Sequence, residues 1–446
     1  MVVTTTMKMV RRMAVVAVVL KWARTSPRRM LGAAAVVAVW LHNHRLERER
    51  AYYTSVFHMI QTVVFVVRKT LSVGFRRMVL GVSNHPYWTW YEEIVVRTIN
   101  FSARTGDVTA PRAALDVFEG FQRVTATWIA NASVRNVDMG LGHGKGDALW
   151  ITLDKKTKLG SGPVILYYHG GGYCVGSAGM YINAHCEWLR RMRDEHGMEA
   201  GVLSIEYPLA PETKYPENLK FAYRAYDHLV DDLGVLPSSI VLGGDSAGGG
   251  IAFSVAKHAH EHRLHSRKTL PALAGIVLIS PWVNHSCESD SHGEHVETDY
   301  IAGADLIGDY TMAYCGDKDK ALIDPSISAI HSHVDFLPPI MLTLGTREVF
   351  GDDIRIFRDK LHQAGKPVTL HEGEECPHIH PLLWPLFDKH STRALSQISH
   401  FCAQRIQFRE NHNSISCAWQ DRVFLSRVQC DSNRQLDLPE SNPQQA

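Results

Sequence analysis

The chain has 446 residues, of which 45% are hydrophobic and 21% are charged, and its formal net charge at pH 7 is +1. This length and composition predict a folded protein with a large core and exclude a disordered or collagen-like chain. The nearly neutral charge gives no general reason to expect nucleic-acid binding. None of the 8 cysteines forms a Cys-x-x-Cys pair, which argues against a zinc ribbon, a redox motif or a disulfide scaffold.

Residues 1–80 form a basic, apolar N-terminal segment that is a candidate membrane anchor. The apolar runs Met13–Leu20 and Met30–Leu41 are both shorter than the ~20 residues that cross a bilayer, and His58 and Gln61 interrupt a third run. An amphipathic surface helix and a transit or signal peptide stay open as alternatives. We therefore expect either a membrane-associated protein with a single N-terminal anchor, as at the endoplasmic reticulum, or a cytoplasmic or organellar one.

Residues 81–148 are predicted to form a helical cap region. Aromatic and aliphatic side chains recur at helical spacing over His85–Val96 and again from Asp116 to Ile129. These residues either line a pocket or simply pack, and the sequence does not separate the two.

Residues 149–400 alternate between strand-like and helix-like segments and are predicted to form the catalytic domain. Alternation of this kind predicts an α/β fold, with a mostly parallel central sheet flanked by helices. The predicted strands are 149–153, 163–168, 200–206, 239–242, 273–279, 339–344 and 368–371, and the predicted helices include 221–232 and 352–363. Residues 401–446 read as a polar, partly disordered tail.

The most informative motif is Gly244-Asp245-Ser246-Ala247-Gly248, which matches G-x-S-x-G. A short apolar strand precedes it and a helix-compatible stretch follows. In that context the pattern places a serine nucleophile on a sharp turn, with glycines where side chains would collide. Ser246 is therefore the predicted nucleophile of an acyl-transfer reaction.

A second motif, His169-Gly170-Gly171-Gly172, follows the strand that ends at Tyr168. Consecutive glycines allow backbone N–H groups to point into a site and meet the negative charge that develops on a carbonyl oxygen. We expect Gly171, Gly172 and Ala247 to donate these N–H groups, forming an oxyanion hole. No Gly-Lys-Ser/Thr ending follows the glycines, which argues against a phosphate-binding loop.

Four histidines follow the serine motif: His258, His260, His262 and His265. His258 and His262 stand four residues apart, so one helical face can carry both. No acidic residue directly follows His258, as H-E-x-x-H would require, and basic residues crowd the region. We therefore predict a solvated helix without a metal site. The serine mechanism itself requires no metal or organic cofactor.

Together the two motifs resemble the hormone-sensitive-lipase-like family of α/β-hydrolases, over roughly residues 145–395. The segment Glu206–Glu212 is similar to the family's Y-R-L-A-P-E, with Pro208 in place of arginine, and Ser280-Pro281-Trp282 resembles its S-P-W. The resemblance implies an α/β-hydrolase fold, and an acid and then a histidine after the last strands.

That resemblance assigns the acid to Glu348, where the family usually has aspartate, with Asp352 as the alternative. Cys376-Pro377-His378 resembles the family's M-P-H, which makes His378 the base and His380 its rival. The chain is then expected to be a serine ester hydrolase.

The basic N-terminus is similar to membrane-anchored relatives that deacetylate sterols or arylacetamides, which implies a small, lipophilic short-acyl ester as substrate. A non-catalytic ligand receptor on the same scaffold is an alternative, although the presence of both Ser246 and His378 argues against it. An amidase or a secondary-metabolite hydrolase shares the same residues and is not separated. The oligomeric state is left open.

Overall fold

The computed structural model describes residues 131–142, 146–267, 269–301, 304–385 and 387–407, together with single residues and short stretches between 64 and 127. The predictions of an N-terminal anchor and of a disordered tail beyond 407 therefore lie outside the described residues. Within the described part of the chain, no helix combines the length and apolar character needed to span a membrane.

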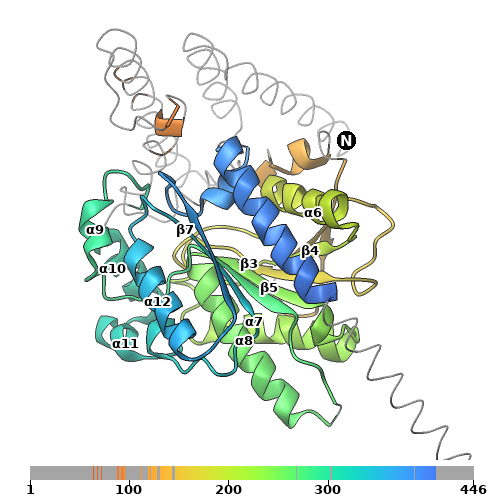
Figure 1. Cartoon of the computed structure of the whole chain (residues 1–446). Coiled ribbons are helices and arrows are strands. Elements are labelled where there is room, and N and C mark those ends of the chain that lie inside the picture. The colour runs from red at the N-terminus through yellow and green to blue at the C-terminus, as the bar shows by residue number, and fades with distance from the viewer. Residues whose placement is uncertain are drawn as a thin grey trace, which may run out of the picture.

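An eight-stranded sheet runs through the centre of the molecule in the order β1-β2-β4-β3-β5-β6-β7-β8 (Figure 1). β3 to β8 are parallel, whereas β2 joins β4 antiparallel and β1 joins β2 antiparallel. The predicted mostly parallel sheet is thus confirmed. The bounds are β1 Ser133–Val137, β2 Ala148–Thr152, β3 Val164–Tyr168, β4 Gly201–Ile205, β5 Ile240–Asp245, β6 Gly275–Ile279, β7 Ile340–Gly345 and β8 Val368–Gly373.

Helices cover both faces of this sheet, as expected for a parallel sheet whose strands are buried on both sides. The α-helices are α6 Ile182–His196, α7 Glu217–Asp227, α8 Ala247–His265, α9 Asp290–Glu294, α10 Ala304–Cys315, α11 Lys318–Ile323 and α12 Gly351–Gln363, and a last helix covers 388–407. A π-helical turn, η1 His228–Asp232, continues α7. Single 3-10 turns are η2 Pro237–Ser239, η3 Ala329–His331 and η4 His380–Leu383.

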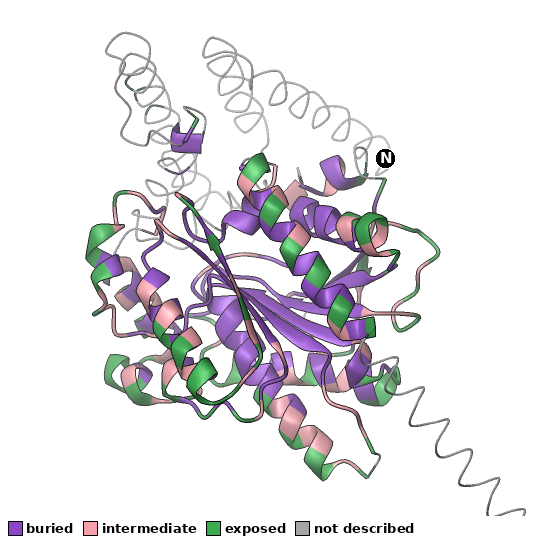
Figure 2. Cartoon of the chain, in the orientation of Figure 1, coloured by how far each residue is buried: buried purple, intermediate pink, exposed green. Residues whose placement is uncertain are grey.

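Two apolar cores follow from the alternation of side chains along each strand. In β3, Leu166 and Tyr168 pack into the core beneath α7 and α8, whereas Ile165 and Tyr167 point into the core beneath α6 and the helix over 388–407. The inner strands β2 to β7 are buried throughout, whereas the edge strands β1 and β8 are partly exposed and the outer helices expose one side to solvent (Figure 2).

The sheet and its covering helices extend beyond the range 149–400 predicted for the catalytic domain. β1 lies inside the range assigned to the cap, and its sequence Ser-Val-Arg-Asn-Val carries no apolar run because it is a half-exposed edge strand. Residues 401–407 continue a helix instead of starting a tail, and Phe401, Cys402 and Ile406 are buried in the core. The sequence predicts a tail here because only one face of this helix is apolar.

The described residues of the predicted cap lie against the catalytic domain. Residues 122–127 are helical, and Gln122 and Thr125 form hydrogen bonds with Asn183 at the start of α6. Trp88 packs edge-on against Phe387, with ring centroids 5.9 Å apart. Its indole N–H donates to the carbonyl of Glu375, so this segment contacts the loop that follows β8.

Candidate active site

The predicted site residues all follow the carboxyl ends of neighbouring parallel strands. The glycine motif follows β3, Ser246 follows β5, Glu348 follows β7 and His378 follows β8. Since β3, β5, β6, β7 and β8 are adjacent in the sheet, their loops meet at one edge, which is where open α/β sheets bind ligands.

Ser246 lies on a sharp turn between β5 and α8. Its φ of 51° and ψ of −122° are unusual for a residue with a side chain, and its backbone N–H donates to the carbonyl of Ile279, 3.0 Å away. The flanking glycines leave no room for side chains. A Cβ on Gly244 would lie 2.2 Å from the carbonyl oxygen of Gly248, and one on Gly248 would lie 2.1 Å from that of Tyr168. The strand, the turn and the helix are therefore packed too closely for anything but glycine.

Backbone N–H groups gather in the loop after β3. Gly171 and Gly172 have positive φ angles of 108° and 59°, and neither N–H forms a hydrogen bond with another described residue. Ala247 is the first residue of α8, where a helical N–H has no partner within the helix. The three predicted oxyanion donors are therefore free to bind an anionic oxygen.

Asp245, the residue before the serine, fixes the start of the glycine loop. Its carboxylate accepts hydrogen bonds from the Gly170 N–H at 2.9 Å, from the Tyr167 hydroxyl at 2.7 Å and from the Tyr181 hydroxyl at 2.9 Å. Burial raises the pKa of Asp245 to about 6, although these hydrogen bonds act in the opposite direction. The nucleophile turn and the glycine loop are thus tied together by one buried side chain.

A second set of contacts holds the far side of the glycine loop. The ring of His169 stacks on Tyr207, with centroids 4.3 Å apart, and the Tyr207 hydroxyl donates to the His169 carbonyl at 2.7 Å. Arg112 donates to the carbonyls of Cys174 and Ala210. These contacts limit how far the loop can move when charge develops beside it.

His378 and Glu348 lie next to each other and are both buried. The distance from His378 Nδ1 to Glu348 Oε2 is 3.7 Å, which is an ion-pair distance and is longer than a hydrogen bond. Burial lowers the pKa of His378, but the carboxylates of Glu348, Asp299 and Asp245 outweigh it, and the net shift is upward. His378 Nε2 has no hydrogen-bond partner among the described residues, so it is not bonded to Ser246.

Ser280 joins the loops that carry the acid and the base. Its hydroxyl donates to Glu348 Oε2 at 2.6 Å and accepts the N–H of Ile379 at 3.0 Å. The N–H of Gly345 also donates to Glu348 Oε2, at 3.0 Å. The S-P-W resemblance includes this serine without giving it a role. Its position directly after the carboxyl end of β6 is the sequence signal that points to one.

Asp299 is a second buried carboxylate beside His378, and nothing in the sequence singled it out. Its Oδ1 accepts the N–H of His378 at 3.3 Å, and its Oδ2 accepts the N–H of Val349 at 2.9 Å. Burial raises the pKa of Asp299 to about 6. Asp299 therefore links the backbone N–H of Val349, the residue after Glu348, to the backbone N–H of His378.

The two rival residues lie elsewhere. Asp352, in the first turn of α12, accepts hydrogen bonds from the Ser291 N–H and from Arg355, and its side chain is 38% exposed. His380 is buried beside His371, with ring centroids 5.4 Å apart, and burial lowers its pKa well below the ordinary value. The geometry therefore pairs His378 with Glu348.

Comparison with known proteins agrees with this architecture. Residues 165–381 match a family described as an alpha/beta hydrolase fold. An acetyl-hydrolase of Streptomyces hygroscopicus is 31% identical over 226 residues, covering 50% of this chain and 71% of that protein. The chain belongs to the hormone-sensitive-lipase-like family of α/β-hydrolases. A solved esterase of the bacterial hormone-sensitive lipase family is 25% identical, with a TM-score of 0.57, covering 72% of this chain and 99% of that one.

Further relatives in the same family are also ester hydrolases. An esterase of Acinetobacter venetianus is 28% identical over 209 residues, covering 47% of this chain and 64% of that protein. A versiconal hemiacetal acetate esterase of Aspergillus parasiticus is 27% identical, covering 52% of this chain and 71% of that protein. The chain is accordingly an enzyme of the carboxylic ester hydrolase class.

Proposed function

We propose that Ser246, His378 and Glu348 form a catalytic triad that hydrolyses short-acyl esters of lipophilic alcohols. The observation that carries this proposal is the convergence of four loops on one sheet edge. The strained serine turn, the glycine loop with free N–H groups and the buried His378–Glu348 pair follow adjacent strands.

In the first half of the reaction, Ser246 Oγ attacks the ester carbonyl carbon while His378 Nε2 takes the hydroxyl proton. The carbonyl π electrons move to the oxygen, and the N–H groups of Gly171, Gly172 and Ala247 donate to that oxyanion. The intermediate collapses as the alkoxide leaves with the proton from His378. Glu348 stabilises the imidazolium through Nδ1 during both proton transfers.

In the second half, His378 takes a proton from water and the resulting hydroxide attacks the acyl-serine. The carboxylic acid departs and the proton returns to Ser246 Oγ, which restores the enzyme. The unpartnered Nε2 of His378 fits this cycle, because catalytic hydrogen bonds are often long or absent before substrate binds and tighten in the complex.

Aromatic side chains around these groups favour a lipophilic substrate. Tyr310 lies so close to Gly172 that a Cβ there would fall 2.0 Å from the ring. Phe350 and Tyr300 contact the His378 ring edge-on, with centroids 5.2 and 5.7 Å away. Aromatic rings bury apolar groups well but offer few hydrogen bonds to a polar alcohol.

The short acyl group is proposed from the names of two relatives, an acetyl-hydrolase and an acetate esterase. The membrane anchor predicted in residues 1–80 would place the enzyme where lipophilic esters concentrate.

The test is a series of p-nitrophenyl esters of increasing acyl length, assayed with the purified full chain. We expect kcat/KM to be highest for acetate or butyrate and to fall for decanoate and palmitate. Highest activity on long acyl chains would contradict the short-acyl assignment but leave the triad standing. Absence of hydrolysis for every ester and for the matching anilide amides would contradict the triad itself.

A further inference from the structure

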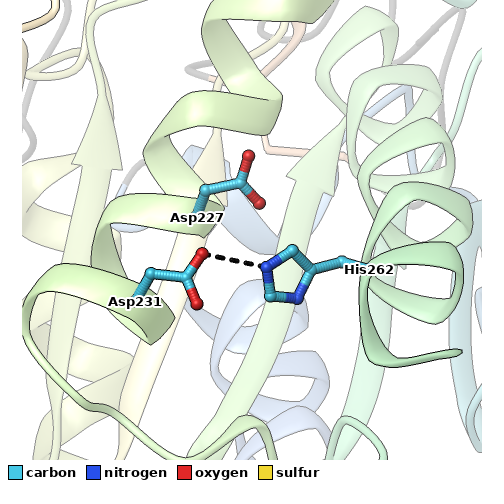
Figure 3. Close-up of side chains that lie close together, drawn as sticks. All are labelled: Asp227, Asp231 and His262. Carbon is cyan, nitrogen blue, oxygen red and sulfur yellow. Dashed lines mark hydrogen bonds and ion pairs between the residues drawn. The ribbon is translucent and has the colours of Figure 1, made fainter. Parts of the chain in front are cut away.

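Two facing helical segments carry paired metal-ligating side chains far from the catalytic residues. Asp227 ends α7 and Asp231 lies in η1, while His258 and His262 lie on α8. Within each pair the residues are four apart, so both members share one helical face. Figure 3 shows the carboxylates of Asp227 and Asp231 and the imidazole of His262 directed toward one another across the gap between the helices.

The distances within this cluster suit a single small cation. His262 Nε2 lies 2.9 Å from Asp231 Oδ2, and His258 Nε2 lies 2.7 Å from Asp227 Oδ1. One ligand atom from each of Asp227, Asp231 and His262 lies within 4.8 Å of the others. A small inward movement of these side chains would bring all three atoms to bonding distance of one ion.

Neighbouring tyrosines hold the imidazole rings in place. Tyr223 stacks on His258, with ring centroids 4.5 Å apart and planes 8° from parallel. Tyr226 meets His258 and His262 edge-on, at 6.1 and 6.0 Å. The two rings are therefore oriented before any ion arrives, which lowers the cost of assembling the site.

Charge and access also fit a divalent cation. Two aspartates supply a charge of −2, which a divalent ion neutralises, and imidazole nitrogen with carboxylate oxygen is a ligand set that zinc accepts. The side chains of Asp227, Asp231 and His262 are 32%, 47% and 19% exposed, so an ion reaches them from solvent.

We propose that Asp227, Asp231 and His262 bind a divalent transition-metal ion, with Zn²⁺ as the best fit. His258 is a positioning residue that orients Asp227, as outer-shell partners of metal ligands commonly do. Binding uses the lone pair of His262 Nε2, so the ring proton resides on Nδ1. The present hydrogen bond between His262 and Asp231 is then replaced by two metal–ligand bonds. The ion would fasten α7 and η1 to α8, roughly four helical turns beyond Ser246.

The chain supplies a matched control in the same π-helical turn. His228 Nδ1 lies 2.7 Å from Asp232 Oδ2, and this pair lies outside the cluster of close ligand atoms formed by Asp227, Asp231 and His262. The pair thus has the same chemistry as His262 and Asp231 but lacks a third ligand among the described residues. His228→Gln removes a histidine without touching the proposed site.

The experiment is equilibrium dialysis of the metal-stripped full chain against Zn²⁺, with bound zinc measured by mass spectrometry. We expect wild type and His228→Gln to bind zinc equally tightly at this site. Asp231→Asn and His262→Gln should lose that binding, and His258→Gln should weaken it by about 10- to 100-fold. Circular dichroism would verify that each variant is folded.

Two results of the dialysis would overturn the proposal. One is absence of zinc binding by wild type, which would leave the cluster as a pair of hydrogen bonds between helices. The other is binding that Asp231→Asn and His262→Gln leave unchanged. A measurement that needs no variant is Co²⁺ substitution of wild type, which should give d–d absorption without a thiolate charge-transfer band. A thiolate band, or no d–d absorption, would also contradict the site.

Discussion

Two buried carboxylates lie beside different parts of His378 and are expected to act in different ways. Glu348 faces the imidazole through Nδ1, whereas Asp299 accepts the backbone N–H of the same residue. Glu348 stabilises the protonated imidazole ring directly. Asp299 holds the backbone of His378 in place and adds a negative charge near the ring.

Replacing Glu348 should therefore be far more damaging than replacing the rival acid. We expect Glu348→Gln to lower kcat by about 10⁴-fold, because the amide no longer stabilises the imidazolium. Asp352→Asn should change kcat little, since that side chain is exposed and bonds to Ser291 and Arg355. Steady-state kinetics on p-nitrophenyl acetate would measure both, and a larger loss in Asp352→Asn would reverse the assignment of the acid.

Asp299 should reveal itself in the pH dependence of the rate. The pKa of His378 is raised, and only its neutral ring accepts the serine proton. As the pH is lowered, kcat/KM should therefore begin to fall at a higher pH than it would for an ordinary histidine. Asp299→Asn removes one of the carboxylates that raise this pKa, so the acid limb should move to lower pH. Burial raises the pKa of Asp299 to about 6, so its carboxylate is fully charged only above that pH.

The control for that experiment is Asp352→Asn, which leaves the carboxylates around His378 in place. A profile in Asp299→Asn that matches wild type, or that moves to higher pH, would contradict the role assigned to Asp299.

At the scale of elements, the site is made by loops that adjacent parallel strands bring together and that a few buried side chains fasten. Asp245 ties the serine turn to the glycine loop, and Ser280 ties the acid loop to the base loop. The functional groups are thus held in place from more than one loop.

A substitution of Gly172 tests how tightly the glycine loop is packed. Gly172→Ala would place a Cβ 2.0 Å from the Tyr310 ring, in addition to the cost of about 1 kcal/mol for a side chain at positive φ. Gly234→Ala has only the second cost, because nothing lies within 4 Å of its Cβ position at a φ of +69°. Gly172→Ala should therefore lower the free energy of unfolding, measured by chemical denaturation, and kcat more than Gly234→Ala does. Equal effects of the two substitutions would contradict the packing described.

The sequence predicted those elements whose signal is local. Strands buried on both faces read as apolar runs, which is why β3, β5, β6 and β7 were located closely. β1 was missed because an edge strand with polar residues gives no such run. Asp299 and Ser280 act through space on loops far along the chain, so no spacing revealed them. The acids that face His258 and His262 come from another helical segment, so the sequence between the two histidines does not reveal them.

At the scale of the whole molecule, the described residues between 133 and 407 share a single sheet, and two cores bury both of its faces. The family assignment rests on this part of the chain.

The central claim is that one serine among the 446 residues performs the chemistry, and covalent labelling of the full chain tests it most directly. We predict that a fluorophosphonate adds one adduct per chain, located on Ser246 by peptide mass spectrometry, and that ester hydrolysis falls in proportion to labelling. Ser246→Ala should take no label and should lose about 10⁶-fold in kcat. Labelling at another residue, or hydrolysis that persists in Ser246→Ala, would contradict the account.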